Sequence, residues 1–158
     1  MSDPYQALED DLRAGPTATA MLARRTGTPV HAVVLATDAP IRTATRMRLG
    51  TDDVGYRRVQ LIAGGRVMSE AENWYARDRL TPAMRAALTD GDVPFGQVIA
   101  ALDPRREILD IKRFDSGPHA MEVHAMVFGG DGLPLAEVIE HYARALLGEV
   151  PEALRRAG

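Results

Sequence analysis

The stretch GYRRVQLIAGGRVMSEAENWY, from Gly55 to Tyr75, decides the fold. Two alternating runs flank its central Gly-Gly pair, a pattern typical of a β-hairpin. Side chains repeat every two residues in a strand, so Arg57 shares one face with Val59 and Leu61. An arginine in such an apolar row either extends out of the core or points into a cavity, where it binds an anion.

The chain on either side of this hairpin predicts further strands and a few helices. Helices are expected where capping residues precede apolar positions at helical spacing, over residues 3–14, 17–25 and 79–88. Strands are expected where β-branched and alternating residues dominate, over residues 30–37, 105–113, 120–128 and 133–143. Residues 38–53 lack a clean period and are expected to form a surface loop, with an arginine-rich flap as the alternative.

Consecutive strands without intervening helices favour antiparallel pairing. The expected class is α+β, with a single antiparallel sheet of about six strands and helices covering one face. At 158 residues the chain predicts one domain, 1–158, with its core in about 8–143 and a peripheral C-terminal tail over 145–158.

Composition narrows the class of function. The net charge is −3 and the basic residues alternate with acidic ones, which argues against a nucleic-acid partner. No apolar run is long enough for a membrane span, and the acidic N-terminus does not resemble a signal peptide. We therefore expect a cytoplasmic protein. The oligomeric state has no signature in the sequence.

The sequence also lacks the common signatures of metal and nucleophile chemistry. There is no cysteine, which excludes thiol nucleophiles and zinc–cysteine sites. His119 and His124 have opposite strand parity and His31 belongs to another strand, so no metal site is expected. No glycine-rich phosphate loop or nucleophile elbow is present.

The last predicted strand contains a second charged residue in an apolar row. Glu140 shares a face with Val138 and Tyr142, whereas Glu137 falls on the opposite face. Arg57 and Glu140 therefore both lie on inward faces. Two interpretations follow: a buried ion pair of little net value, or the two ends of a ligand cavity in which Arg57 binds an anion and Glu140 a hydroxyl.

The second strand of the hairpin favours the cavity. Small or polar side chains are expected next to Arg57 in place of bulky core residues: Val67, Ser69, Ala71 and Asn73. Ser69 and Ala71 are therefore candidate ligand-binding residues.

Several segments, in this order, resemble the chorismate lyase family, whose members convert chorismate to 4-hydroxybenzoate and pyruvate. They are the hairpin YRRVQLIAGGRVMSEAENWY, the helix RLTPAMRAAL followed by VPFG, and the late strands RREILDI and LPLAEVIEHY. The GPTAT segment near the N-terminus also resembles the family's first-helix region. The resemblance covers about residues 8–143 and implies the family's α+β fold.

The resemblance also implies roles for individual residues. Arg57 matches the arginine that binds the ring carboxylate, assisted by the backbone of Phe95 and Gly96. Arg106 matches a further arginine, placed on the carboxylate of the enolpyruvyl arm, and Glu140 matches the glutamate at the ring hydroxyl. Arg57 and Glu140 are therefore the expected catalytic residues.

Two positions depart from the family pattern. The alignment near Glu140 needs one gap, which leaves Glu137 as the alternative, although strand parity favours Glu140. Ala18 stands where better-known members have a methionine at a flap over the ligand. Residues 38–53 align with nothing in the family.

The reaction implied by the resemblance is elimination of pyruvate from chorismate, driven by aromatisation and needing no cofactor. The alternative function is non-catalytic binding of a small aromatic acid, because the same fold serves as the effector-binding module of some GntR-type transcription regulators.

Overall fold

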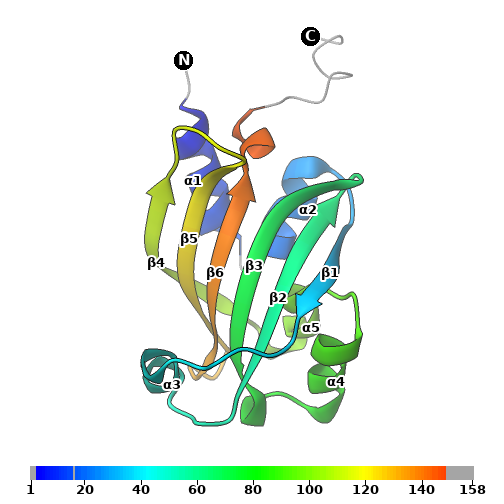
Figure 1. Ribbon diagram of the computed structural model, residues 1–158, viewed down its shortest axis with the longest axis vertical. Helices are drawn as coiled ribbons and strands as arrows, with labels where there is room; N and C mark the ends of the chain where they lie inside the picture. The colour runs from blue at the N-terminus through cyan, green and yellow to red at the C-terminus, as the bar shows by residue number, and fades with distance from the viewer. Residues whose placement is uncertain (1–2, 16, 149–158) are drawn as a thin grey trace.

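The computed structural model describes residues 3–15 and 17–148, which form one six-stranded antiparallel sheet with the strand order β1-β2-β3-β6-β5-β4 (Figure 1). The strands are β1 (Val30–Ala36), β2 (Val54–Ala63), β3 (Arg66–Ala76), β4 (Arg105–Arg113), β5 (His119–Phe128) and β6 (Pro134–Ala143). This architecture confirms the expected α+β class and the antiparallel pairing.

The helices lie between and around these strands. They are α1 (Pro4–Ala14), α2 (Ala18–Thr26), α3 (Thr43–Leu49), α4 (Pro82–Asp90) and α5 (Phe95–Val98), with short 3-10 turns at Arg77–Arg79, Ala100–Leu102 and Arg144–Leu147. Asp3, Thr17 and Thr81 cap α1, α2 and α4 through their side chains, as the sequence predicted. None of the helices in the described ranges has both the length and the apolar composition that crossing a bilayer requires.

The β2–β3 hairpin forms as predicted, with Gly64 and Gly65 at φ 60° and 75° in its turn. Near the tip, the pairing shifts by one residue, so that Leu61 faces Ser69 whereas Ile62 faces Val67. This bulge turns Val67 toward solvent, at 40% exposure. The expectation that Val67 faces inward was therefore wrong, because an inserted residue reverses the face to which the following side chains point.

The inner face of the sheet carries the main core, which α1, α2, α4 and α5 cover. In the view of Figure 1, α1 and α2 lie behind the strands. Leu8 and Leu12 of α1 and Met21 and Leu22 of α2 are almost completely buried against it. This apolar layer is the one in which Arg57 is also buried.

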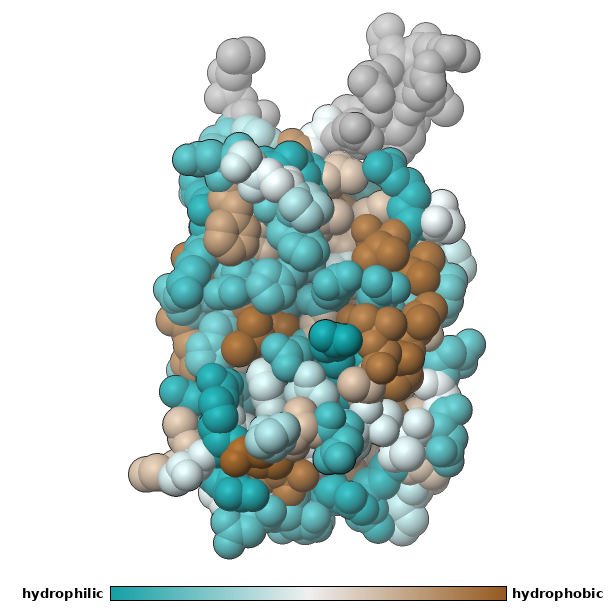
Figure 2. Space-filling model, in the orientation of Figure 1, coloured by the Kyte–Doolittle hydropathy of each residue, from teal (hydrophilic) through white to brown (hydrophobic). Residues whose placement is uncertain are grey.

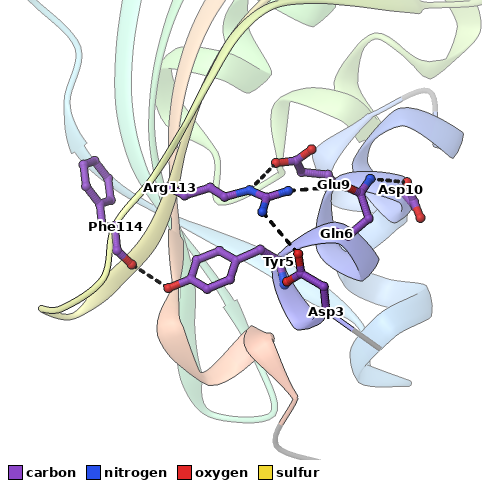
Figure 3. A network of polar contacts seen from close by, with 7 residues as sticks. All are labelled: Asp3, Tyr5, Gln6, Glu9, Asp10, Arg113 and Phe114. Atoms are coloured by element: carbon purple, nitrogen blue, oxygen red, sulfur yellow. Dashed lines mark hydrogen bonds and ion pairs between the residues drawn. The ribbon is translucent and has the colours of Figure 1, made fainter. Parts of the chain in front are cut away.

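Helix α1 is held to the edge strand β4 by a polar network around Arg113 (Figure 3). The Arg113 guanidinium donates to Glu9 at 2.7 Å, and to Asp3 and Gln6 at 3.3 Å each. The Tyr5 hydroxyl donates to the Phe114 carbonyl at 2.7 Å. The network therefore fixes α1 against β4.

The outer face of the sheet is covered in part by α3, which the sequence analysis assigned to a loop. That expectation was wrong because the helix is only two turns long, too short to show a helical period. Its last residue, Leu49, is fully buried with Tyr56, Trp74 and Met126 in a second, smaller cluster. Helices therefore pack on both faces, not on one as expected.

A buried carboxylate fixes α3 to the sheet. Glu137 of β6 is fully buried, and its Oε2 accepts hydrogen bonds from Arg48 of α3 at 2.8 Å and from His124 of β5 at 2.5 Å. Burial alone would raise the pKa of Glu137, but Thr45, His124 and Arg48 together lower it below its ordinary value. The carboxylate is therefore charged at neutral pH.

A second bulge, between His119 and Met121, brings His119 to the outer face, where its ring packs 5.3 Å from that of His141. His119 and His124 thus share a face, and the parity argument made from the sequence was wrong for this pair. The described part of the chain holds no group of three His, Cys, Asp or Glu side chains that could bind a metal ion.

The rest of the outer face is mostly hydrophilic, with an apolar area over β1 and β2 (Figure 2). Val33 and Leu35 of β1 are 40% and 42% exposed there.

At the C-terminal end, Leu146 is buried and its carbonyl accepts two hydrogen bonds from Arg25, so the tail begins inside the fold. The remainder of the expected peripheral tail, 149–158, lies outside the described residues.

Replacing Gly55 with alanine is expected to lower the free energy of unfolding by about 1–3 kcal/mol. A Cβ at this position would stand 2.4 Å from the Tyr75 ring, which itself packs against Phe95. Chemical denaturation of G55A measures the loss. The same substitution in a Tyr75→Leu background should cost less, because the ring is gone; an equal cost in both backgrounds would contradict this packing.

The Glu137→Gln variant should lose about 2 kcal/mol of stability at neutral pH. Because folding lowers the pKa of Glu137, its contribution is present above the ordinary value of 4.5 and is lost as the pH falls through the lower folded value. The variant's stability should therefore depend less on pH at the acid end. Glu122→Gln is the matched control, since Glu122 bonds to His141 on the same face but is 25% exposed. Identical acid limbs for wild type and E137Q would refute the role.

Candidate functional site

A small cavity lies between the inner face of the sheet and the helices α2 and α5. It encloses about 30 Å³, room for one or two water molecules. Its walls are mainly apolar and come from β2, β3, β5 and β6, with Phe95, Gly96 and Ile99 on the helical side. Two charged side chains, Arg106 and Glu140, also line it.

The helical wall is formed where the start of α2 meets α5. A Cβ on Gly96 would stand 2.8 Å from Cβ of Thr17, so glycine is what permits the two segments to touch. Ala18 and Thr19, in the first turn of α2, complete this wall. The VPFG corner predicted from the sequence thus supplies a contact surface for the N-terminal helices.

Arg106 and Glu140 form an ion pair inside the cavity. The Arg106 Nη2 donates to Glu140 Oε1 at 2.5 Å, and both side chains are more than nine-tenths buried. The Tyr142 hydroxyl donates to the same oxygen at 2.9 Å. Although burial disfavours the cation, the adjacent Glu140 carboxylate raises the pKa of Arg106 above its ordinary value.

Arg57 of β2 is also fully buried. It lies opposite Asn73 of β3. Its Nη2 donates to the carbonyls of Val93 at 2.7 Å and Gly91 at 3.4 Å, in the link between α4 and α5. Its Nε and Nη1 have no hydrogen-bond partner, and it makes no ion pair with Glu140. Burial lowers the pKa of Arg57, although a guanidinium keeps its charge in proteins.

The structure brings most of the predicted site residues to one place. Ala18, Ala71, Phe95, Gly96, Arg106 and Glu140 all line the cavity. Arg57 does not line it but lies beside Asn73, which does, and whose Oδ1 is also buried without a partner.

Two predicted residues lie elsewhere. Ser69 faces inward but lines a separate hollow near the start of β5, because β3 and β6 separate beyond this residue. Glu137, the alternative to Glu140, lies on the opposite face of the sheet under α3. Strand parity therefore separated the two glutamates correctly.

Tyr142 contacts the charged pair of this site, but sequence reasoning gave it no role. It was placed on the same face as Glu140 but was interpreted as apolar packing. The signal was its spacing, because residues two apart on a strand are neighbours on one face, and a buried tyrosine hydroxyl needs a partner.

Comparisons with known proteins agree with this architecture. No protein-family model matches the chain. An uncharacterized protein, y4mC, from Sinorhizobium fredii is 30% identical over 118 residues, which are 61% of this chain. The chain spans about half the length of this curated relative, since the match covers 50% of it.

Several solved structures have a similar fold. The effector domain of PhnF from Mycobacterium smegmatis superposes with a TM-score of 0.62 at 14% identity, covering 82% of this chain and 90% of that one. The structure of PhnF itself gives 0.61 at 13% identity, with 84% and 65% covered. A GntR-family transcriptional regulator from Enterococcus faecalis gives 0.53 at 12% identity, with 72% and 94% covered. At these identities the likeness is one of fold alone, and the chain has the fold of the PhnF effector domain and of this GntR-family regulator.

Proposed function

We propose that this domain binds a small carboxylic acid and acts as a non-catalytic effector-binding module. The observation that carries the proposal is Arg57, a fully buried guanidinium with two unpartnered nitrogens. Among the described residues no ion pair reaches this cation, although the negative charge of Asp92 acts on it from nearby. A bound carboxylate would add a direct partner and satisfy the free N–H groups.

The charges around the cavity favour a monoanion. Arg106 is already neutralised by Glu140, so Arg57 contributes the one positive charge in excess among these three groups. A ligand with a single carboxylate balances that charge. A second carboxylate would have to lie close to Glu140, and like charges at short range in an apolar site repel strongly.

The lining of the cavity favours a flat, apolar body next to Glu140. Arg57 lies outside this lining, so its contact with the ligand requires the cavity to extend past Asn73. Val59, Leu61, Val127 and Val138 supply apolar walls, which suit an aromatic ring. The enclosed volume is too small for such a ring, so binding requires the first turn of α2 to separate from α5. Gly96 and Thr17 mark the contact that would open.

The second candidate function is the chorismate pyruvate-lyase reaction, cofactor-independent, with Arg57 and Glu140 as its catalytic residues. The observation in its favour is a cavity that holds a glutamate and an arginine together. The reaction needs more than this arrangement offers, because chorismate carries two carboxylates and the arginine assigned to the second one is paired with Glu140. The binding function is therefore the better supported of the two.

The Arg57→Met variant tests the proposed function. Titration calorimetry with 4-hydroxybenzoate should show saturable binding to wild type and about 10- to 100-fold weaker binding to R57M, since two charge-assisted hydrogen bonds are lost. The melting temperature of unliganded R57M should stay close to that of wild type, because the removal of a buried charge without an ion-pair partner offsets the loss of the hydrogen bonds to the Gly91 and Val93 carbonyls.

The matched control is Arg58→Met, which changes the neighbouring exposed arginine on the outer face and should leave binding unchanged. Incubation with chorismate should release no pyruvate above the spontaneous rate. Release by wild type but not by R57M would overturn the non-catalytic assignment in favour of the lyase. No binding to wild type at millimolar ligand, together with no pyruvate release, would refute both.

The Arg106→Met variant should behave in the opposite way in the absence of ligand. Removal of this guanidinium leaves Glu140 buried without its counter-ion, at a cost of about 3–5 kcal/mol in the free energy of unfolding. Chemical denaturation measures the loss, with the exposed neighbour Arg105→Met as the control. A loss no larger than that of the control would show that the ion pair contributes nothing to stability.

A further inference from the structure

A second hollow lies between β3 and the start of β5, away from the cavity on the inner face. Its volume is about 210 Å³, against about 30 Å³ for that cavity. It forms because β6 pairs with β3 only as far as Ser69, opposite Tyr142, and the two strands then diverge toward the tip of the β2–β3 hairpin (Figure 1). The hollow therefore has room for a group of several non-hydrogen atoms without any movement of the helices.

Two β-bulges turn side chains toward this hollow, one from β3 and one from β5. The bulge at Met68 brings Val67, and the bulge at Ala120 brings His119, to positions where both line it. A bulge gives up regular pairing in order to re-aim a side chain, and bulges are found preferentially beside functional sites. Two bulges that face one hollow indicate a feature built for contact.

The wall that contains Pro118 and His119 is held in place by Arg144. The Arg144 backbone N–H donates to the Pro118 carbonyl at 2.9 Å, and its guanidinium donates to the carbonyls of Gly117 at 2.8 Å and His119 at 3.2 Å. These bonds occupy N–H groups of Arg144, which does not line the hollow itself. The wall is therefore fixed before a ligand arrives, which lowers the entropic cost of binding.

The polar side chains of the hollow offer mainly acceptors. The Glu70 carboxylate accepts from Gln60 Nε2 at 3.0 Å through Oε1, and among the described residues no hydrogen bond reaches its Oε2. Gln60 acts as the donor in this bond, so its amide oxygen is left as an acceptor. Ser69 is almost completely buried, and its Oγ has no partner. Of the described residues that line the hollow, Glu70 is the one Asp, Glu, Lys or Arg.

We propose that this hollow is a binding site for a small primary ammonium ion that carries a short apolar chain. Such an amine is charged at neutral pH and has three N–H donors, which match the Glu70 carboxylate and the oxygens of Gln60 and Ser69. The apolar chain packs against Val67 and Pro118. The site is separate from the one at Arg57 and does not depend on the proposed function.

The charge of Glu70 selects the class of ligand. A carboxylate in the hollow would meet the Glu70 carboxylate at short range, and like charges repel. A quaternary ammonium ion keeps the attraction to Glu70 but has no N–H group, so the buried Ser69 oxygen would stay without a partner. Affinity should therefore fall from a primary ammonium ion to a quaternary one, and further to a carboxylate.

The test follows the backbone amide chemical shifts of the full chain by NMR during titration with three probes: n-butylammonium, n-butyltrimethylammonium and butyrate. In wild type, n-butylammonium should give saturable shifts at residues 67–70 and at His119. The quaternary probe should bind about fivefold more weakly, and butyrate should not shift these amides. The Glu70→Gln variant should bind n-butylammonium about tenfold more weakly, because a neutral amide replaces the carboxylate.

Glu72→Gln is the matched control, because Glu72 lies two residues away on the same face of β3, where it accepts from Tyr56 and does not line the hollow. This variant should leave the affinity unchanged. Equal weakening by E70Q and E72Q would show a general attraction to surface charge and would overturn the inference. Absence of saturable shifts in wild type, or tighter binding of butyrate, would also overturn it. Either result would leave the proposed function at Arg57 untouched, since R57M should bind n-butylammonium as wild type does.

Discussion

The burial of charge in one apolar layer is the constraint on which the structure depends. Two guanidinium groups, of Arg57 and Arg106, lie between the sheet and its covering helices, where water cannot solvate them. Arg106 has a carboxylate and Arg57 has two carbonyl oxygens. This difference separates a charge-balanced pair, which is costly to break, from a cation without an ion-pair partner.

The short segment before and within α5 determines how the helices pack around this layer. Gly96 permits α5 to touch the cap of α2, and the link before α5 supplies the carbonyls that hold Arg57. The same short segment therefore forms a wall of the cavity and positions its neighbouring cation. A ligand that engages Arg57 would act directly on the contact between α2 and α5.

Much of the fold was predictable because periodicity and turn chemistry are local signals. The strand parity of Arg57, Glu137 and Glu140 was read correctly, since each lies in a regular part of its strand. The bulges at Met68 and at Ala120 were not predictable, because an inserted residue leaves no mark in a pattern of alternation.

The sequence predicted on which face each charged residue lies better than it predicted which charges form a pair. Parity placed Arg57 and Glu140 on inward faces, but it does not say which cation meets which anion. That depends on strand order: β6 lies between β3 and β5, and Arg106 reaches Glu140 from the edge of the sheet. Arg106 was identified as a site residue only through the family resemblance.

Helix α3 was missed because its stability comes from contacts with Trp74 and Glu137, which are distant in sequence.

The two glutamates of β6 have a consequence for how the sheet is assembled. Glu137 and Glu140 lie three residues apart and point to opposite faces, and each meets its own arginine on its own side. If β6 slipped by one residue against its neighbours, both carboxylates would exchange layers and each would be buried away from its counter-ion. The opposed pair thus acts against a shift in register of β6, one of the two central strands of the sheet.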